Sequence, residues 1–187
     1  MTLVSAKISI SRTHAVLIAC LTLSHDILLA DQAKMFSVNP DPQELAEYIF
    51  SDESDSDESR SWMHAGAPPP TNVAALKILF EFDSNEITPT SIETISRLAQ
   101  ALKSAQAENK PILIEGHTDT TGDASYNVDL SKRRAQTVKD YLVDSYGIAQ
   151  ERLFIEGLGE TQLFTPDFPA ASINRRVQVK QHIIHTN

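Results

Sequence analysis

The sequence predicts a mixed α/β fold, with elements in the order β-α-β-α-β-β, over residues 71–187. Three observations lead to this fold class. Short apolar runs of strand length recur in this part of the chain, two stretches with helical spacing of apolar residues separate them, and glycine or proline marks several junctions. Because helices that cross between strands make those strands parallel, we expect a partly parallel, mixed sheet of about four strands with helices on one face.

The first strand and the first helix of this fold lie between residues 76 and 102. Alternate positions from Leu76 to Phe82 carry large apolar side chains, which is typical of a strand with one buried face. Thr88 and Pro89 then open a helix, because Thr can cap an N-terminus and Pro suits the first helical position. The apolar stripe of this helix consists of Ile92, Ile95, Leu98 and Leu102.

The second half of the fold contains one long helix and three strands. Its expected elements are a buried strand over 111–115, a loop over 116–126, a helix over 127–146, and strands over 152–156 and 175–182. Val138 and Leu142 lie on one side of the long helix and are expected in the core. Asn127 is a good N-cap for this helix, and Gly147 is a C-cap candidate.

The region before residue 71 differs sharply in composition. The segment Met35–Ser59 holds eight Asp or Glu and no Lys or Arg, so it accounts for eight of the nine net negative charges. We interpret 34–70 as an acidic, Pro-rich, disordered linker in which Pro42–Phe50 has the spacing of a short amphipathic helix. A calcium loop of Asp52, Asp55 and Asp57 is disfavoured, because it lacks the glycine and terminal glutamate of such loops. The rest of the chain is nearly neutral, so we expect no nucleic-acid partner.

Residues 1–33 have the features of a signal or export segment. Lys7 and Arg12 precede the apolar run Ala15–Leu23, which is too short to span a bilayer, since a span needs about 20 residues. This order is typical of a secretory signal, and the alternative is a buried helix of a cytoplasmic protein. The candidate cleavage points are before Cys20 and after Ser24 or Ala30. Only cleavage before Cys20 would lipidate the cysteine and create a membrane contact.

Five short motifs carry the functional information: GHTD (116–119), YN (126–127), LSKRRA (130–135), GLGE (157–160) and NRRV (174–177). Together they resemble the OmpA-like C-terminal domain family, which includes the peptidoglycan-associated lipoprotein and the stator protein of the flagellar motor. The family pattern is GHTD, then YN..LS..RA, then G.GE and NRRV. The resemblance covers about 105 residues, and the motifs follow one another in the family's order. A single GHTD would be weak, whereas the ordered set is specific.

The resemblance implies that the domain binds the diaminopimelate residue in the stem peptide of peptidoglycan. In the family, the Asp of GHTD and the Arg of LS..RA hold this residue, and they correspond to Asp119 and Arg134. The ligand-side arginine of NRRV corresponds to Arg175. The chemistry agrees with these roles, because diaminopimelate presents an ammonium and a carboxylate on its free end. An Arg suits the carboxylate, since a guanidinium can bind it with two parallel hydrogen bonds.

Three further residues complete the predicted site. Asn127 shares a helix face with Arg134, Thr118 lies beside Asp119, and Asn85 follows the first strand. Simpler roles are open for the main residues: Asp119 could cap a turn, and Arg134 could form a surface ion pair.

The stretch 161–173 departs from the family pattern. It lacks the glycine that often precedes NRRV, and it carries two unusual aromatic residues, Phe164 and Phe168. The shape of this loop, and with it the reach of Arg175, is therefore open. Arg176 points to the opposite side in a regular strand, so we expect it to be structural.

We expect a non-enzymatic binding domain in the periplasm that tethers envelope components to the cell wall, with no catalytic residue, cofactor or metal. One alternative is a periplasmic protein-interaction scaffold without wall binding. The other is an enzyme that uses Ser131, His117 and Asp119, although the chain has neither a nucleophile elbow nor a metal-ligand cluster. A hydrogen bond between His117 and Ser131 would favour the enzyme, and a pocket shared by Asp119 and Arg134 would favour wall binding.

Overall fold

The structure of this chain is a computed structural model that describes residues 33–37, 39–51, 72–81 and 83–183. The predicted signal segment with Cys20, and the acidic run that contains Asp52, Asp55 and Asp57, lie outside the described residues. The strands are β1 (Lys34–Met35), β2 (Ala74–Leu76), β3 (Ile112–His117), β4 (Leu153–Gly159) and β5 (Arg176–Gln181). The α-helices are α1 (Pro42–Phe50), α3 (Ile92–Leu102) and α4 (Ala124–Tyr146). The short 3-10 helices are η2 (Pro89–Ser91), η3 (Ala105–Ala107), η4 (Gln150–Arg152) and η5 (Ser172–Asn174).

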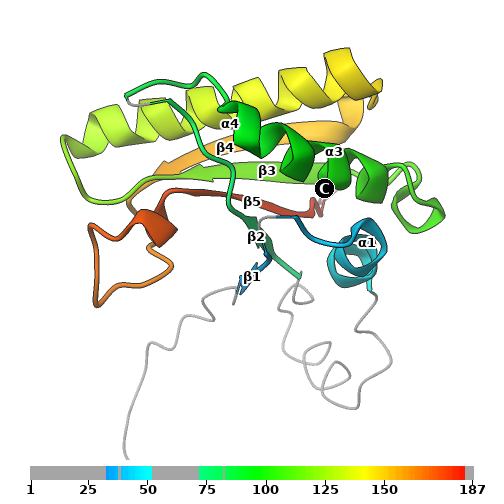
Figure 1. The fold of residues 1–187 in the computed structure, drawn as a ribbon, viewed down its shortest axis with the longest axis horizontal. Coiled ribbons are helices and arrows are strands. Elements are labelled where there is room, and N and C mark those ends of the chain that lie inside the picture. The colour runs from blue at the N-terminus through cyan, green and yellow to red at the C-terminus, as the bar shows by residue number, and fades with distance from the viewer. Residues whose placement is uncertain (1–32, 38, 52–71, 82, 184–187) are drawn as a thin grey trace, which may run out of the picture. The chain divides into compact units, whose positions relative to one another are not determined.

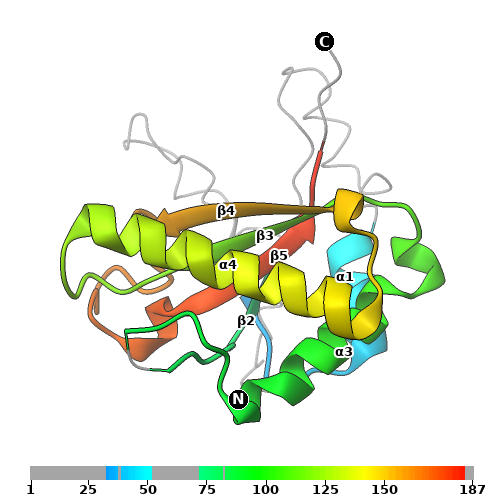
Figure 2. The same ribbon diagram turned by 90° about the horizontal axis from the view of Figure 1, so that it is seen from above.

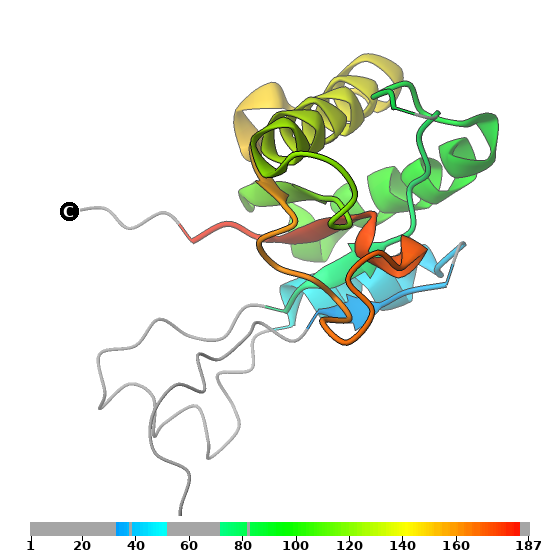
Figure 3. The same cartoon turned by 90° about the vertical axis from the view of Figure 1, so that its left-hand side faces the viewer.

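The strands form one five-stranded sheet in the order β1-β2-β5-β3-β4. The pairs β3/β4 and β1/β2 are parallel, whereas β5 runs antiparallel to both of its neighbours. Figures 1 and 3 show α3 and α4 on one face of this sheet, where their apolar residues and those of the strands form a single core. The predicted mixed α/β class is confirmed, and β1 adds an edge strand to the four that were expected.

Residues 33–51 belong to this folded unit. The amides of Lys34 and Phe36 donate to carbonyls beside and within β2, at 2.9 and 3.0 Å. Helix α1 begins at the N-cap Asp41, whose side chain accepts from two backbone amides. Its buried residues, Leu45, Ala46, Ile49 and Phe50, join the common core. Helix α1 therefore belongs to the folded unit, although it lies within the linker predicted over 34–70. Its four apolar side chains on one face are sufficient to pack the helix against the core.

The strand predicted from Leu76 to Phe82 is wrong, because β2 covers Ala74–Leu76 and ends where the predicted strand begins. The amide of Ile78 donates to the carbonyl of Leu76 at 3.0 Å, which closes a tight turn. Beyond this turn, an isolated bridge between Phe80 and Ile87 is the strand pairing that remains among the described residues. Thr88 does not cap α3; its hydroxyl instead donates to the carbonyl of Leu79, at 3.2 Å.

Helix α4 rests directly on β3 and β4, which it crosses in Figure 2. A Cβ atom at Gly116 would lie 2.1 Å from the carbonyl oxygen of Ser131, and one at Gly157 would lie 2.6 Å from the amide nitrogen of Lys132. The glycines of the GHTD and GLGE motifs therefore allow the main chain of the helix to approach the strands. As predicted, Gly147 ends the helix with φ of 65°.

The beginning of α4 corrects one prediction. The N-cap is Asp123 and not Asn127, because the carboxylate of Asp123 accepts from the amides of Ser125 and Tyr126 at 2.9 and 3.1 Å. The helix thus starts one turn earlier than expected, and Asn127 becomes a buried residue within it. Among the described residues, no helix combines the length and apolarity needed to cross a bilayer.

Candidate functional site

Asp119 lies just beyond the C-terminal end of β3 and is only 5% exposed. One carboxylate oxygen accepts from the Arg175 guanidinium at 2.5 Å, and the other accepts from the amide of Thr121 at 3.0 Å. Burial alone would raise the pKa of Asp119, but the hydrogen bonds from Arg175 and Thr121 outweigh it and hold the pKa below its ordinary value. Asp119 is therefore an anion at neutral pH.

Arg134 projects from α4 and is 9% exposed. Its Nε donates to the carbonyl of Ser84 at 3.0 Å, and its guanidinium carbon lies 5.0 Å from the centre of the Phe80 ring. Within the part of the chain that the structure describes, no carboxylate lies within 4 Å of Arg134. Burial, followed by the charge of Arg175, lowers the pKa of Arg134, while Asp119 is among the groups that raise it. The three charged groups thus act on one another electrostatically.

The two arginines of the NRRV motif lie in different environments. The Arg175 side chain is 48% exposed and pairs with Asp119, so the loop does bring it to the site. Arg176 is 4% exposed, and its guanidinium donates to the carbonyls of Asn174 and Gln162, at 3.1 and 3.0 Å. Burial lowers the pKa of Arg176 to about 10.

Asn127 and Glu160 hold the β3–α4 loop in place. The side-chain amide of Asn127 donates to the carbonyls of Asp119 and Thr121, at 3.3 and 3.2 Å. It also donates to the carboxylate of Glu160 at 2.8 Å. These three bonds engage the amide nitrogen fully, so the structure gives Asn127 a supporting position behind Asp119. The sequence identifies Glu160 only as part of a motif, because its partner lies on a helix 33 residues away.

The loop after β2 is fastened to α4 at three points. Asp83 accepts from the hydroxyl of Tyr126 at 2.6 Å, and the Ser84 carbonyl accepts from Arg134. The side-chain amide of Asn85 donates to the hydroxyl of Thr137 at 2.9 Å. Asn85 therefore lies against α4, one turn beyond Arg134.

Thr118 is less accessible than the other predicted site residues. It is 3% exposed, its amide donates to the carbonyl of Gly159 at 2.8 Å, and its buried hydroxyl has no hydrogen-bond partner among the described residues. The side chain would therefore have to move before a ligand could reach its hydroxyl.

Ser131 and His117 do not form the pair that an enzyme would need. The Ser131 hydroxyl donates to the carbonyl of Val128 at 2.8 Å and accepts from the amide of Gly159 at 2.9 Å. His117 is 1% exposed, and its Nε2 accepts from the side-chain amide of Gln178 at 3.2 Å. Burial, and after it the charge of Arg176, lowers the pKa of His117 to about 3, so the ring is neutral. Both side chains thus have structural positions.

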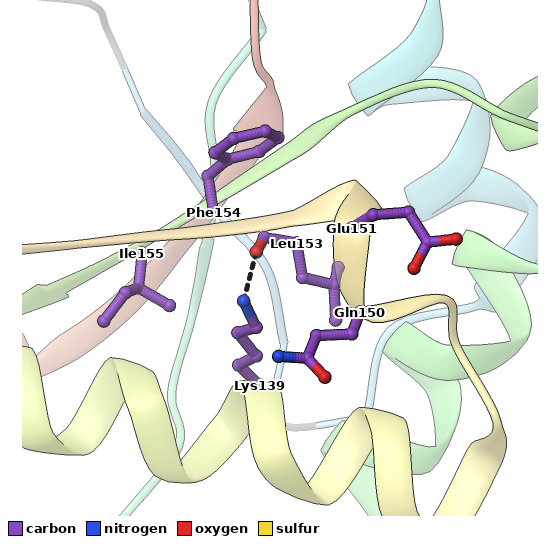
Figure 4. Close-up of a pocket in the computed structure, with 6 residues that line it drawn as sticks. All are labelled: Lys139, Gln150, Glu151, Leu153, Phe154 and Ile155. Atoms are coloured by element: carbon purple, nitrogen blue, oxygen red, sulfur yellow. Dashed lines mark hydrogen bonds between the residues drawn. The ribbon is translucent and has the colours of Figure 1, made fainter.

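A surface hollow at the start of β4 contains none of the predicted site residues. It is lined by Lys139, Gln150, Glu151, Leu153, Phe154 and Ile155. Figure 4 shows Lys139 reaching from α4 to the carbonyl of Leu153, at 2.6 Å. Asp119 instead follows the other end of the β3/β4 pair, where the loops after β3 and β4 lie side by side in Figures 1 and 3.

The arrangement at that end can bind a zwitterion. The carboxylate of Asp119 faces an exposed guanidinium, and a second, largely buried guanidinium on α4 lacks a carboxylate within the described residues. The charges come from three separate segments, the loop after β3, helix α4 and the residue before β5. Residues 79–176, which contain all three segments, match the OmpA family profile. The chain belongs to the OmpA family.

Individual members of the OmpA family show how much of the chain is shared. Outer membrane porin F of Pseudomonas aeruginosa is 36% identical over 107 residues, which cover 56% of this chain and 30% of that protein. The chain thus spans less than a third of this relative's length. Outer membrane protein A of Bordetella avium is 35% identical over 54% of this chain and 52% of its own length. The names of both relatives agree with the predicted envelope location.

The fold of the OmpA-family domain is also found in a solved MotB-like protein from Desulfovibrio vulgaris. The TM-score is 0.51, with 22% identity over 78% of this chain and 97% of that one. At this identity the likeness concerns the fold alone.

Proposed function

We propose that this OmpA-family domain binds peptidoglycan non-covalently through the free end of diaminopimelate in the stem peptide. Asp119 receives the ammonium, and Arg134 receives the carboxylate. Arg175, exposed at the mouth of the site, supports the carboxylate or leaves Asp119 when the ammonium arrives. Tethering of envelope components to the cell wall in the periplasm would follow from this binding.

The observation that carries the proposal is the unmatched guanidinium of Arg134. An almost buried cation is costly unless an anion pairs with it. The Arg134 side chain makes one hydrogen bond within the described part of the chain, from Nε to the carbonyl of Ser84, so both terminal nitrogens of the guanidinium remain available to a ligand. Those two nitrogens form the fork that binds a carboxylate with two parallel hydrogen bonds.

Asp119 retains capacity for an ammonium group. An ionised carboxylate has about four lone-pair positions, and the described contacts use one on each oxygen. Because Asn127 and Thr121 hold the main chain and one oxygen of Asp119, the carboxylate is oriented before any ligand binds. Such preorganisation reduces the entropy lost on binding.

The direct test measures binding of a soluble diaminopimelate-containing stem peptide by calorimetry. Removing one partner of a charged hydrogen-bonded pair costs about 2 to 5 kcal/mol, which is a loss of about thirtyfold or more. Asp119→Ala and Arg134→Ala should each show such a loss. Arg97→Ala is the matched control, because Arg97 pairs with Glu93 on the surface of α3 and not with the site. It should bind like the wild type.

Two results would count against the proposal. Undiminished binding by folded Arg134→Ala protein would reject the assigned role of Arg134. Failure of the wild-type protein to sediment with purified sacculi or to bind the peptide would favour the alternative of a periplasmic interaction scaffold. A stem peptide with lysine in place of diaminopimelate has the ammonium but no neighbouring carboxylate. The wild type should therefore bind the lysine peptide more weakly than the diaminopimelate peptide, whereas Arg134→Ala should bind the two peptides equally.

A further inference from the structure

Phe168 is the most exposed large apolar side chain among the described residues. It is 69% exposed, whereas the next most exposed, Leu79 and Tyr126, are at 41%. A single exposed apolar side chain is common on protein surfaces, so a role for Phe168 has to follow from where its loop places it. The loop carries two unusual aromatic residues, Phe164 and Phe168. The Phe164 ring lies 5.5 Å from the guanidinium of Arg176, whereas the Phe168 ring has no comparable contact among the described residues.

The loop holds Phe168 in a fixed position. Asn174 is fully buried, and its side-chain amide donates to the carbonyls of Phe168 and Pro169 at 2.9 and 3.0 Å. The same side chain accepts from the amide of Thr165 at 3.0 Å. In addition, the amide of Phe168 donates to the carbonyl of Thr165, at 3.1 Å. Because these hydrogen bonds hold the main chain at Phe168, this part of the loop loses little conformational entropy when a ligand binds.

This loop adjoins the proposed binding site. The amide of Thr120, next to Asp119, donates to the carbonyl of Pro169 at 3.2 Å. At the other end of the loop, Asn174 immediately precedes Arg175, which pairs with Asp119. The residue that follows Phe168 and the residue that anchors its loop are thus both connected to the charged cluster. Phe168 therefore lies next in sequence to a residue that is hydrogen-bonded to the loop of Asp119.

The chemistry of peptidoglycan indicates what meets this ring. The stem peptide is attached to a sugar of the glycan strand, and diaminopimelate is its third residue. Two residues of the stem peptide therefore separate diaminopimelate from the sugar. A pyranose ring has one face of C–H groups, which packs on the face of an aromatic ring. A protein partner would instead need about 800 Å² of contact on each side. The two neighbours of Phe168 in the loop are Asp167 and Pro169, which are exposed and add no second large apolar side chain.

We propose that Phe168 is a carbohydrate-contacting residue that binds the glycan strand beside the stem peptide. This inference rests on the proposed function, and it adds a sugar subsite to the diaminopimelate site. The protein should therefore prefer a stem peptide that still carries its disaccharide over the same peptide without sugar. A single aromatic contact of this kind predicts a preference of about three- to tenfold.

The test compares two soluble probes by calorimetry: a diaminopimelate-containing tripeptide, and the same tripeptide joined to its N-acetylglucosamine and N-acetylmuramic acid disaccharide. Phe168→Ala should reduce affinity for the disaccharide-peptide to that for the peptide and leave peptide affinity unchanged. Phe168→Trp should keep the preference. Phe154→Ala is the matched control, because Phe154 is an exposed aromatic at the opposite end of β4, and it should also keep the preference.

The outcomes separate this proposal from the proposed function. Equal affinity of the wild type for both probes would overturn the sugar subsite and leave the stem-peptide site intact. An equal loss for both probes in Phe168→Ala would also overturn it, because the residue would then shape the loop and not contact sugar. Binding of neither probe by the wild type would reject the proposed function itself.

Discussion

Truncation of Leu45 to alanine tests whether α1 is part of the folded domain or part of a linker. Leu45 is completely buried in the common core, on the face of α1 that packs against α3. Replacing a fully buried leucine with alanine costs about 2 to 5 kcal/mol, because the transfer free energy is lost and a cavity remains. A domain of this size has a total stability of about 5 to 15 kcal/mol. Leu45→Ala should therefore remove a large fraction of it.

The matched control is Glu47→Ala on the exposed side of the same helix. Glu47 accepts only a surface hydrogen bond from Gln43 at 3.0 Å, so this change should alter stability by no more than about 0.5 kcal/mol. Urea unfolding followed by circular dichroism measures both variants on the full chain. If Leu45→Ala unfolds within about 0.5 kcal/mol of the wild type, α1 does not stabilise the domain and the linker interpretation is correct.

Three other substitutions test the site and its support. Arg134→Lys keeps the charge but loses the two-pronged geometry, so calorimetry should show stem-peptide binding at least about tenfold weaker than the wild type; equal binding would mean that Arg134 contributes charge alone. Burial lowers the pKa of His117 to about 3 in the folded protein, so as the pH falls below about 6.5 the imidazole is protonated in the unfolded chain and stays neutral in the folded one. The free energy of unfolding should therefore drop by about 2 kcal/mol between pH 7 and pH 5. His117→Gln should lack that part of the drop in urea unfolding, and an identical pH profile would refute the linkage. Gly116→Ala places a Cβ against the main chain of α4, so thermal unfolding should show a loss of about 1 to 3 kcal/mol, and a wild-type melting temperature would show that the helix can move away freely.

The sequence predicted the elements whose periodicity is strong. Helices α3 and α4 and strands β3 and β5 lie within a few residues of their expected places, because their apolar spacing reflects burial against one core. The two-residue strand β1 carries no pattern of its own. Helix α1 has the expected spacing, but its acidic surroundings concealed the fact that its apolar face is docked. Composition describes the solvent-facing side of such a segment and not the side that packs.

The sequence motifs predicted the charged residues of the site, whereas the contacts that support these residues could not be predicted from the sequence. In the structure Asp119 pairs with Arg175, and both charges affect the pKa of Arg134, whereas their role in ligand binding stays a prediction. Asn127 was expected at a helix end because its residue type favours caps, yet Asp123 takes that position and Asn127 turns inward to Glu160. Such contacts depend on which elements meet in space, and local propensity cannot indicate that.

The contact of α4 with the sheet has a consequence for selectivity. Asp119 follows β3, and Arg134 lies on α4. A Cβ atom at Gly116 of β3 would lie 2.1 Å from the carbonyl oxygen of Ser131, so the main chains of β3 and α4 are in direct contact there. Because no side chain separates the two main chains at Gly116, the elements that carry Asp119 and Arg134 have little freedom to move toward or away from each other. The proposed site would therefore select ligands by the distance between their ammonium and carboxylate groups. A zwitterion whose ammonium and carboxylate are separated by one additional methylene group should then engage Asp119 or Arg134 but not both, and substitutions on the outer surface of the helix should not change this selectivity.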